Sequence, residues 1–126
     1  MEEISTENAP GAIGPYSQAI RTGDTVYVSG QGPADPDSRE VEVKGVREET
    51  AQTLENVSAI LEAAGTSINE VVKANVYLQD MDDYDDVNDV YAEYMSEPFP
   101  ARAAVEVADL PIDIRVEIEV VAAGED

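Results

Sequence analysis

Hydrophobic and polar positions alternate with a period of two in two segments near the C-terminus, 99–107 and 115–120. This spacing is typical of strands that bury one face. The apolar positions are Ala103, Val105 and Val107 in the first segment and Val116, Ile118 and Val120 in the second. If both strands share one buried face, the opposite face carries Arg102, Ala104 and Glu106 beside Arg115, Glu117 and Glu119. The pattern therefore predicts a candidate site where a guanidinium and carboxylates share one surface beside a small residue.

Two helices are predicted upstream of these strands. Residues 46–64 have a hydrophobic stripe at three- and four-residue steps. Its members are Val46, Thr50, Leu54, Val57, Leu61 and Ala64. Gly65 follows where a helix-ending glycine belongs. A second helix is expected over 84–95, with Asp82 as its cap and with Val87, Tyr91 and Tyr94 facing inward.

The remaining segments predict strands joined mainly by hairpins. Residues 16–22 and 25–31 flank Gly23-Asp24, which is a hairpin signal. Residues 71–78 form a β-branched run after one helical turn, and 1–6 form a short edge strand. The order predicts a single α+β domain over 1–126, with a mostly antiparallel or mixed sheet and two helices on one face. Because the other face carries Tyr77, Ala104 and Val121, we expect a homo-oligomer to shelter it.

Composition restricts the chemistry. The chain has no Cys and no His, which excludes thiolate nucleophiles, thiolate metal sites and Ser–His or Cys–His mechanisms. Acid–base catalysis must therefore use Asp, Glu, Tyr, Lys, backbone groups or water. The acidic run 80–86 does not fit an EF-hand, because Val87 stands where that loop needs glycine.

Charge is the second compositional feature. With 28 acidic and seven basic residues, the formal net charge is −21. Self-repulsion of this size destabilises a compact state unless salt screens it, so we expect the acidic surface of a halophilic protein. No apolar run is long enough to span a membrane, and no signal-peptide pattern opens the chain, so a cytoplasmic protein is expected.

Motifs along nearly the whole chain resemble the Rid family, the YjgF-type or RidA-like enamine/imine deaminases. They are the loop from Ala9 to Ala19, Val28-Ser29-Gly30-Gln31, 56–65, 71–80, Asn88 with Tyr91, Phe99-Pro100-Ala101-Arg102, and Glu117-Ile118-Glu119. The resemblance implies a chorismate-mutase-like fold and a homotrimer with active sites between subunits. It also implies hydrolysis of 2-iminoacids such as 2-iminobutanoate and 2-iminopropanoate, released by pyridoxal-phosphate enzymes, to 2-ketoacids and ammonia. That family uses no metal and no organic cofactor.

The resemblance also implies roles for individual residues. Arg102 is expected to bind the substrate carboxylate, and Glu117 to exchange protons with the substrate and a water. The expected pocket residues are Tyr16, Ser29, Gly30, Asn88 and Ala104. Ala104 stands where many relatives have Cys, so only its backbone can contribute there. Gly32 replaces a larger residue, which predicts a wider pocket, and the loop before Phe99 is short beside some relatives.

The residues alone leave alternatives open. Without the motif, an ion pair with one of the many carboxylates is the favoured explanation of Arg102. Only the motif favours Glu117 over Glu119 as the acid–base group. Asn88 on a helix is more often a structural hydrogen-bonding residue. A non-catalytic binder of small carboxylates such as 2-ketoacids is the competing function. An RNA-directed translation inhibitor fits less well, because nucleic acid requires a basic surface.

Overall fold

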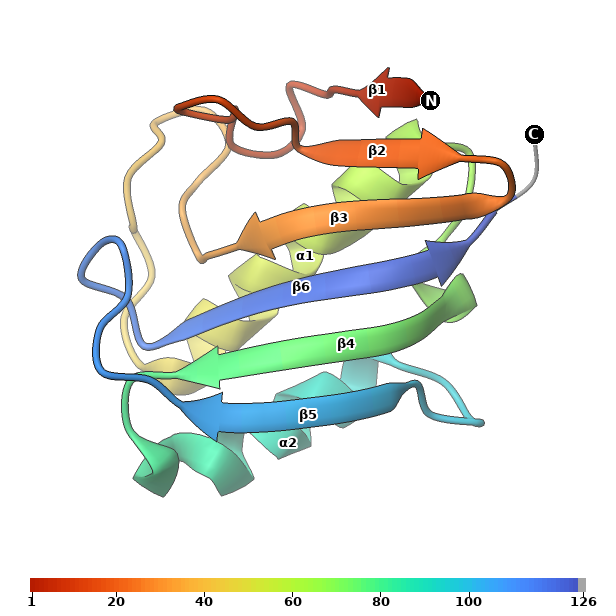
Figure 1. The fold of residues 1–126 in the computed structure, drawn as a ribbon. Coiled ribbons are helices and arrows are strands. Elements are labelled where there is room, and N and C mark those ends of the chain that lie inside the picture. The colour runs from red at the N-terminus through yellow and green to blue at the C-terminus, as the bar shows by residue number, and fades with distance from the viewer. Residues whose placement is uncertain (125–126) are drawn as a thin grey trace.

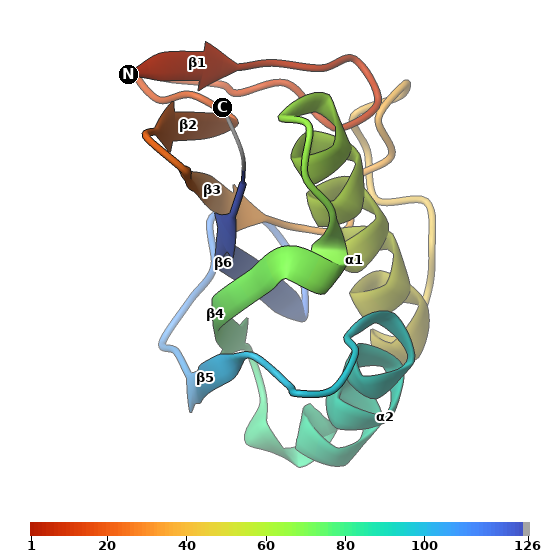
Figure 2. The ribbon, with the colours of Figure 1, turned by 90° about the vertical axis from the view of Figure 1, so that its right-hand side faces the viewer.

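The computed structural model describes residues 1–124, which form two layers: a six-stranded sheet with two α-helices on one face (Figures 1 and 2). The strands are β1 (Glu2–Ile4), β2 (Ala19–Thr22), β3 (Thr25–Gln31), β4 (Val71–Leu78), β5 (Ala101–Glu106) and β6 (Val116–Ala123). The helices are α1 (Val46–Ala63) and α2 (Tyr84–Tyr94), with short 3-10 turns η1 (Ile68–Glu70) and η2 (Met81–Asp83). The strand order is β1-β2-β3-β6-β4-β5, and β4 and β5 pair in parallel. The α+β prediction is confirmed.

The core lies between the sheet and α1. Every member of the predicted stripe on this helix is buried, from Val46 to Ala64. Gly65 has a φ of 83°, which is the left-handed conformation expected of a residue that ends a helix. Glu49 is the exception to the amphipathic pattern, because this charged side chain is only 6% exposed.

Strands β1 and β2 are shorter than the predicted 1–6 and 16–22. Residues 16–18 belong to a loop because the buried side chain of Gln18 bonds the backbone across it. Its Oε1 accepts from the Thr6 N–H at 2.7 Å, and its Nε2 donates to the Pro10 carbonyl at 2.8 Å. The Gln18 amide thus forms hydrogen bonds with backbone groups that would pair with a neighbouring strand if the strand were longer.

The predicted cap of the second helix is wrong. Asp80, not Asp82, acts as a cap: its carboxylate accepts a hydrogen bond from the Asp82 N–H at 2.8 Å. The turn η2 precedes α2, so the cap lies one short turn earlier than the hydrophobic pattern indicates.

The predicted face of β5 is also wrong. Arg102 pairs with Ala74 and Ala104 with Val76, and both partners are buried beneath the helices. Arg102 and Ala104 therefore point to the helix side, whereas Ala103 and Val105 point outward. Because β5 is an edge strand over which only α2 packs, its more apolar face is left open.

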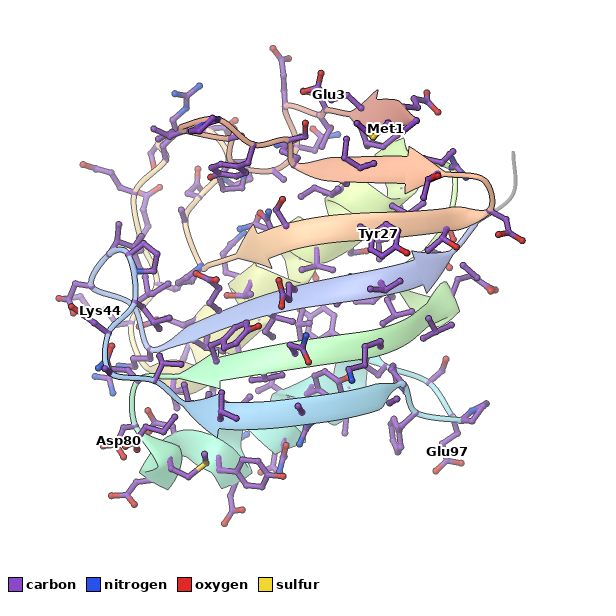
Figure 3. All side chains as sticks on the ribbon, in the orientation of Figure 1. Met1, Glu3, Tyr27, Lys44, Asp80 and Glu97 are labelled. Carbon is purple, nitrogen blue, oxygen red and sulfur yellow. The ribbon has the colours of Figure 1, made fainter. Side chains whose placement is uncertain are left out.

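On β6 the alternation is as predicted. Val116, Ile118 and Val120 are buried, so Glu117 and Glu119 lie on the open face with Tyr77. Tyr27 also projects from this face and is 50% exposed (Figure 3). Within residues 1–124, no helix is long and apolar enough to cross a membrane.

Candidate functional site

Glu117 lies against an irregularity in the neighbouring strand. The β3–β6 register shifts between Val28 and Gln31, and Gly30 falls within the shift. A Cβ atom at Gly30 would lie 2.9 Å from the carboxyl carbon of Glu117 and closer still to Oε2. Glycine therefore allows the carboxylate to lie directly on the β3 backbone.

The environment of Glu117 favours its protonated form. Burial raises the pKa of this carboxyl, and the negative charge of Glu119 raises it further. No described residue donates a hydrogen bond to Glu117. A half-buried carboxyl with a raised pKa and free oxygens is suited to give and take protons.

Glu119 has a different environment, although it lies on the same face two residues away. Its Oε1 accepts hydrogen bonds from the Asn75 amide at 3.1 Å and from the Tyr77 hydroxyl. The bond to Glu119 is the main reason why the pKa of Tyr77 rises to about 12. Glu119 is thus held by its neighbours, whereas Glu117 is available to a ligand.

A pocket of about 370 Å³ opens beside Glu117. Tyr16 and Gly30 line it with Glu117, and the loop after β5 adds Pro111, Ile112 and Ile114. Gly32, which was expected to widen the pocket, is one of its lining residues. Ile114 Cδ1 lies 3.0 Å from the position of a Cβ on Gly32, so Ile114 fills the space that the glycine leaves.

Ser29 supports this site from the side. Its hydroxyl donates a 2.6 Å hydrogen bond to the Ser17 carbonyl, which ties β3 to the loop that carries Tyr16. Ser29 lines a separate depression on the open face with Tyr27 and Glu119. It therefore adjoins the Glu117 pocket without lining it.

Arg102 lies in a second cluster, between β5 and α2. Its guanidinium carbon is 4.8 Å from the Tyr91 ring centroid and 5.6 Å from that of Tyr84, both within cation–π range. One guanidinium nitrogen donates to the Tyr84 hydroxyl at 3.1 Å. Asn88 lowers the pKa of the Tyr84 hydroxyl, and half-buried Ala104 follows Arg102 on the same face of β5.

Arg102 differs from the other well-anchored arginines. Arg21, Arg47 and Arg115 each have a carboxylate oxygen within 4 Å. Among residues 1–124, no carboxylate forms such an ion pair with Arg102. Within the described residues, the simple ion-pair explanation of Arg102 therefore finds no support, and no carboxylate there occupies its positive charge.

The site residues expected from the sequence thus form two groups rather than one. The first lies at the Glu117 pocket and consists of Glu117, Tyr16, Gly30 and the adjacent Ser29; the second consists of Arg102, Asn88 and Ala104. Arg102 and Glu117 are on opposite faces of the sheet, contrary to the prediction from alternation. A single chain does not bring them together.

Sequence reasoning missed Tyr84 as a partner of Arg102 and Glu49 as a buried carboxylate. Tyr84 stands four residues before Asn88 and seven before Tyr91, so it shares their helix face, and that spacing was a usable signal. No signal marked Glu49, which looked like one of several acids at a helix start. In the described part of the chain, no cluster of acidic side chains is arranged to hold a metal ion.

Comparison with known proteins extends these observations. Residues 6–124 match the family model described as Endoribonuclease L-PSP. A RutC family protein of Pyrococcus horikoshii is 54% identical over 96% of this chain and 96% of its own length. Human 2-iminobutanoate/2-iminopropanoate deaminase is 51% identical over 94% of this chain and 87% of its own length.

Solved structures agree in fold. RidA from an Antarctic Psychrobacter superposes with a TM-score of 0.94 at 48% identity, covering 98% of this chain and 99% of RidA. Escherichia coli TdcF with bound serine superposes with a TM-score of 0.92 at 38% identity, covering 98% of each chain. The α+β sheet and its two covering helices are therefore the RidA fold. The chain belongs to the Endoribonuclease L-PSP family, which includes YjgF and RidA.

Proposed function

We propose that this protein hydrolyses 2-iminoacids and their enamine tautomers, such as 2-iminobutanoate and 2-iminopropanoate, to 2-ketoacids and ammonia. The observation that carries this proposal is the Glu117 carboxyl, which is half-buried, has a raised pKa and projects into a pocket without a hydrogen-bond partner among the described residues. The human, bovine and goat relatives named as deaminases of these two substrates support it.

The chemistry requires only proton transfers and water. Protonated Glu117 gives its proton to the imine nitrogen, which makes the carbon electrophilic. The resulting carboxylate accepts a proton from the attacking water as the new C–O bond forms. Glu117 then returns that proton to the nitrogen. As the C–N bond breaks, the hydroxyl proton of the tetrahedral intermediate passes to Glu117, so the ketoacid and ammonia leave and Glu117 is protonated again. These steps consume one water and no oxidant. In the cell, the reaction would remove reactive by-products of pyridoxal-phosphate enzymes in the cytoplasm.

Arg102 supplies the second requirement, recognition of the substrate carboxylate. A guanidinium binds a planar carboxylate through two parallel hydrogen bonds, and Arg102 has no competing carboxylate among residues 1–124. The serine bound to TdcF shows that a related protein of this fold accepts a small amino acid.

Use of both groups requires two copies of the chain. Because Arg102 and Glu117 lie on opposite faces of the sheet, we propose a homotrimer in which Arg102 of one subunit meets Glu117 of the next. The exposed apolar residues of the open sheet face, such as Tyr27 and Val105, support its burial against a neighbouring copy.

The activity is tested by generating an iminoacid with an amino-acid oxidase and measuring how fast ketoacid forms. Wild type is expected to accelerate release, and Glu117→Gln to lose about 10²- to 10⁴-fold, the usual contribution of a general acid–base group. Arg102→Ala is expected to lose most activity, and Glu119→Gln to keep it. If wild type and Arg102→Ala release ketoacid at the same uncatalysed rate, the deaminase proposal is wrong.

The shared site is tested by complementation. Arg102→Ala and Glu117→Gln subunits are unfolded together, refolded as a mixture and assayed. In randomly mixed trimers, about a quarter of the sites combine an intact Arg102 with an intact Glu117 from a neighbour. Recovery near that level supports the intersubunit site, whereas a mixture as inactive as its components contradicts it.

The same assay separates the competing functions. A non-catalytic binder of 2-ketoacids would retain Arg102-dependent affinity with no turnover. RNA cleavage is disfavoured because Arg21, Arg47 and Arg115 are paired with carboxylates and the net charge is −21.

A further inference from the structure

The Tyr84 hydroxyl accepts a hydrogen bond from the Arg102 guanidinium at 3.1 Å. The neighbouring Asn88 side chain first, and Arg102 second, lower the pKa of Tyr84.

One proton on this hydroxyl is therefore left over. A phenol oxygen has two acceptor positions and a single O–H donor, and the bond from Arg102 uses an acceptor position. Tyr84 is 36% exposed, so its hydroxyl lies at the surface beside the guanidinium. No described residue accepts its proton.

We propose that Tyr84 is a second ligand for the substrate carboxylate and donates its O–H to one of the two carboxylate oxygens that Arg102 binds. This inference rests on the proposed function, because it names a residue that recognises the same substrate. Nothing in the sequence motifs singled out Tyr84.

The local geometry suits this role. The Tyr91 ring lies beneath the guanidinium and is 5% exposed, which restricts how Arg102 can turn. Asn88 lies one helical turn from Tyr84 on the same helix face, and the bond from Arg102 holds the Tyr84 hydroxyl beside the guanidinium. The three α2 side chains thus orient the arginine and one extra donor toward the same point.

The neutral character of these partners also matters. A carboxylate at the same place would hold Arg102 equally well but would compete with the substrate for it. Aromatic rings and a hydroxyl position the cation without cancelling its charge. In a chain of net charge −21, this arrangement preserves a local attraction for an anion.

The test measures binding of 2-oxobutanoate, a stable 2-ketoacid, to wild type and to Tyr84→Phe by calorimetry. Phenylalanine keeps the ring over Arg102 and removes only the hydroxyl. Affinity is expected to fall roughly tenfold, as for loss of one charge-assisted hydrogen bond. Tyr77→Phe is the matched control, because its hydroxyl bonds Glu119 on the opposite face and its affinity should match wild type.

The iminoacid assay provides the kinetic readout. Tyr84→Phe should raise KM with kcat nearly unchanged, because the hydroxyl binds the carboxylate away from the reacting carbon. Equal affinity of wild type and Tyr84→Phe, an equal loss in Tyr77→Phe, or a wild type that binds no 2-oxobutanoate overturns the inference. A wild type that binds 2-oxobutanoate through Tyr84 but hydrolyses no iminoacid refutes the proposed function and leaves the ligand role intact.

Alkaline pH supplies a readout that a structural role would not move. The charged groups that act on Tyr84 are Arg102 on β5 and Asp85 on α2. When Tyr84 ionises, it loses the donated proton and neutralises Arg102, so affinity for 2-oxobutanoate should fall as pH rises through its lowered pKa. Tyr84→Phe should lack this alkaline loss; the same loss in both proteins contradicts the role.

Discussion

Glu117 and Glu119 differ only in environment. Both lie on the open face of β6, two residues apart, so alternation assigns them the same surroundings. The structure separates them because Asn75 and Tyr77 bond Glu119, whereas Gly30 leaves room for Glu117 at the pocket. Sequence alone left the choice to a family motif, because cross-strand partners depend on register rather than on local pattern.

The raised pKa of Glu117 has a consequence for stability. Burial first and the charge of Glu119 second raise the folded-state pKa above the unfolded value of about 4.3. The folded state therefore binds this proton more tightly, and ionised Glu117 destabilises the fold at neutral pH. Glu117→Gln should unfold at a higher denaturant concentration than wild type at pH 7.

The stability gain of Glu117→Gln should shrink as pH falls through the folded pKa and disappear below the unfolded one. Glu3→Gln is the control, because Glu3 is exposed on the edge strand and its substitution removes one charge from the surface. Chemical unfolding at several pH values checks both variants. A gain in Glu3→Gln as large as in Glu117→Gln would mean that net charge, not burial, is responsible.

Gly30 is expected to be required for activity more than for folding. In Gly30→Ala the new Cβ overlaps the Glu117 carboxylate and displaces it from the pocket. A misplacement of about 1 Å can reduce the rate about a hundredfold. Kinetics and thermal unfolding of the same sample check this prediction. Activity should fall strongly, whereas the melting temperature should change little.

At the scale of elements, the buried Glu49 carboxylate on α1 holds the loop that forms one wall of the Glu117 pocket. Glu49 Oε1 accepts from the Arg115 N–H at 2.8 Å, and Oε2 lies 3.6 Å from Arg115 Nε. The loop that ends at Arg115 carries Ile112 and Ile114, which line the pocket. A helix residue outside the site therefore determines where the pocket wall stands.

Glu49→Ala should destabilise the protein by about 1–3 kcal/mol, because it leaves the Arg115 N–H without an acceptor. Glu49→Gln keeps an acceptor oxygen for the Arg115 N–H. It also removes a carboxylate whose ionised form is disfavoured by burial, as its raised pKa indicates, so this variant should lose much less stability. Equilibrium unfolding distinguishes the two. Equal losses would show that charge, rather than the accepted bond, is what matters at this position.

The elements themselves were largely predictable. The bounds of β3 and β4 match the prediction, and α1 differs by one residue, because strong periodicity reflects a buried face. The faces of β5 were not predictable from alternation. An edge strand covered by only one helix can leave its apolar side open, and its partner strand, not its own pattern, determines which side that is.

At the scale of the whole molecule, the acidic surface should make stability depend on salt. The acidic side chains behind the net charge of −21 repel one another at low ionic strength. At about 1 M salt the screening length falls to roughly 3 Å, so most of this repulsion is removed. The melting temperature should rise steadily with KCl. A melting temperature indifferent to KCl would refute the halophilic prediction.

The candidate residues could be named from the sequence, but their arrangement could not. Arg102 and Glu117 were expected on one face, and the sheet places them on two. The pattern within β5 carries no information about its register against β4, which determines the face that Arg102 occupies. This is why the residue types were predictable and the geometry was not.

The tyrosines at the Glu117 pocket and around Arg102 have an optical consequence. The chain contains six tyrosines and no tryptophan, so its near-ultraviolet fluorescence comes almost entirely from tyrosine. Three of the six, Tyr16, Tyr84 and Tyr91, line the pocket or contact Arg102. Occupancy of the site should therefore be visible in the unlabelled protein, as a change in intrinsic emission that follows the ligand and weakens in Tyr84→Phe.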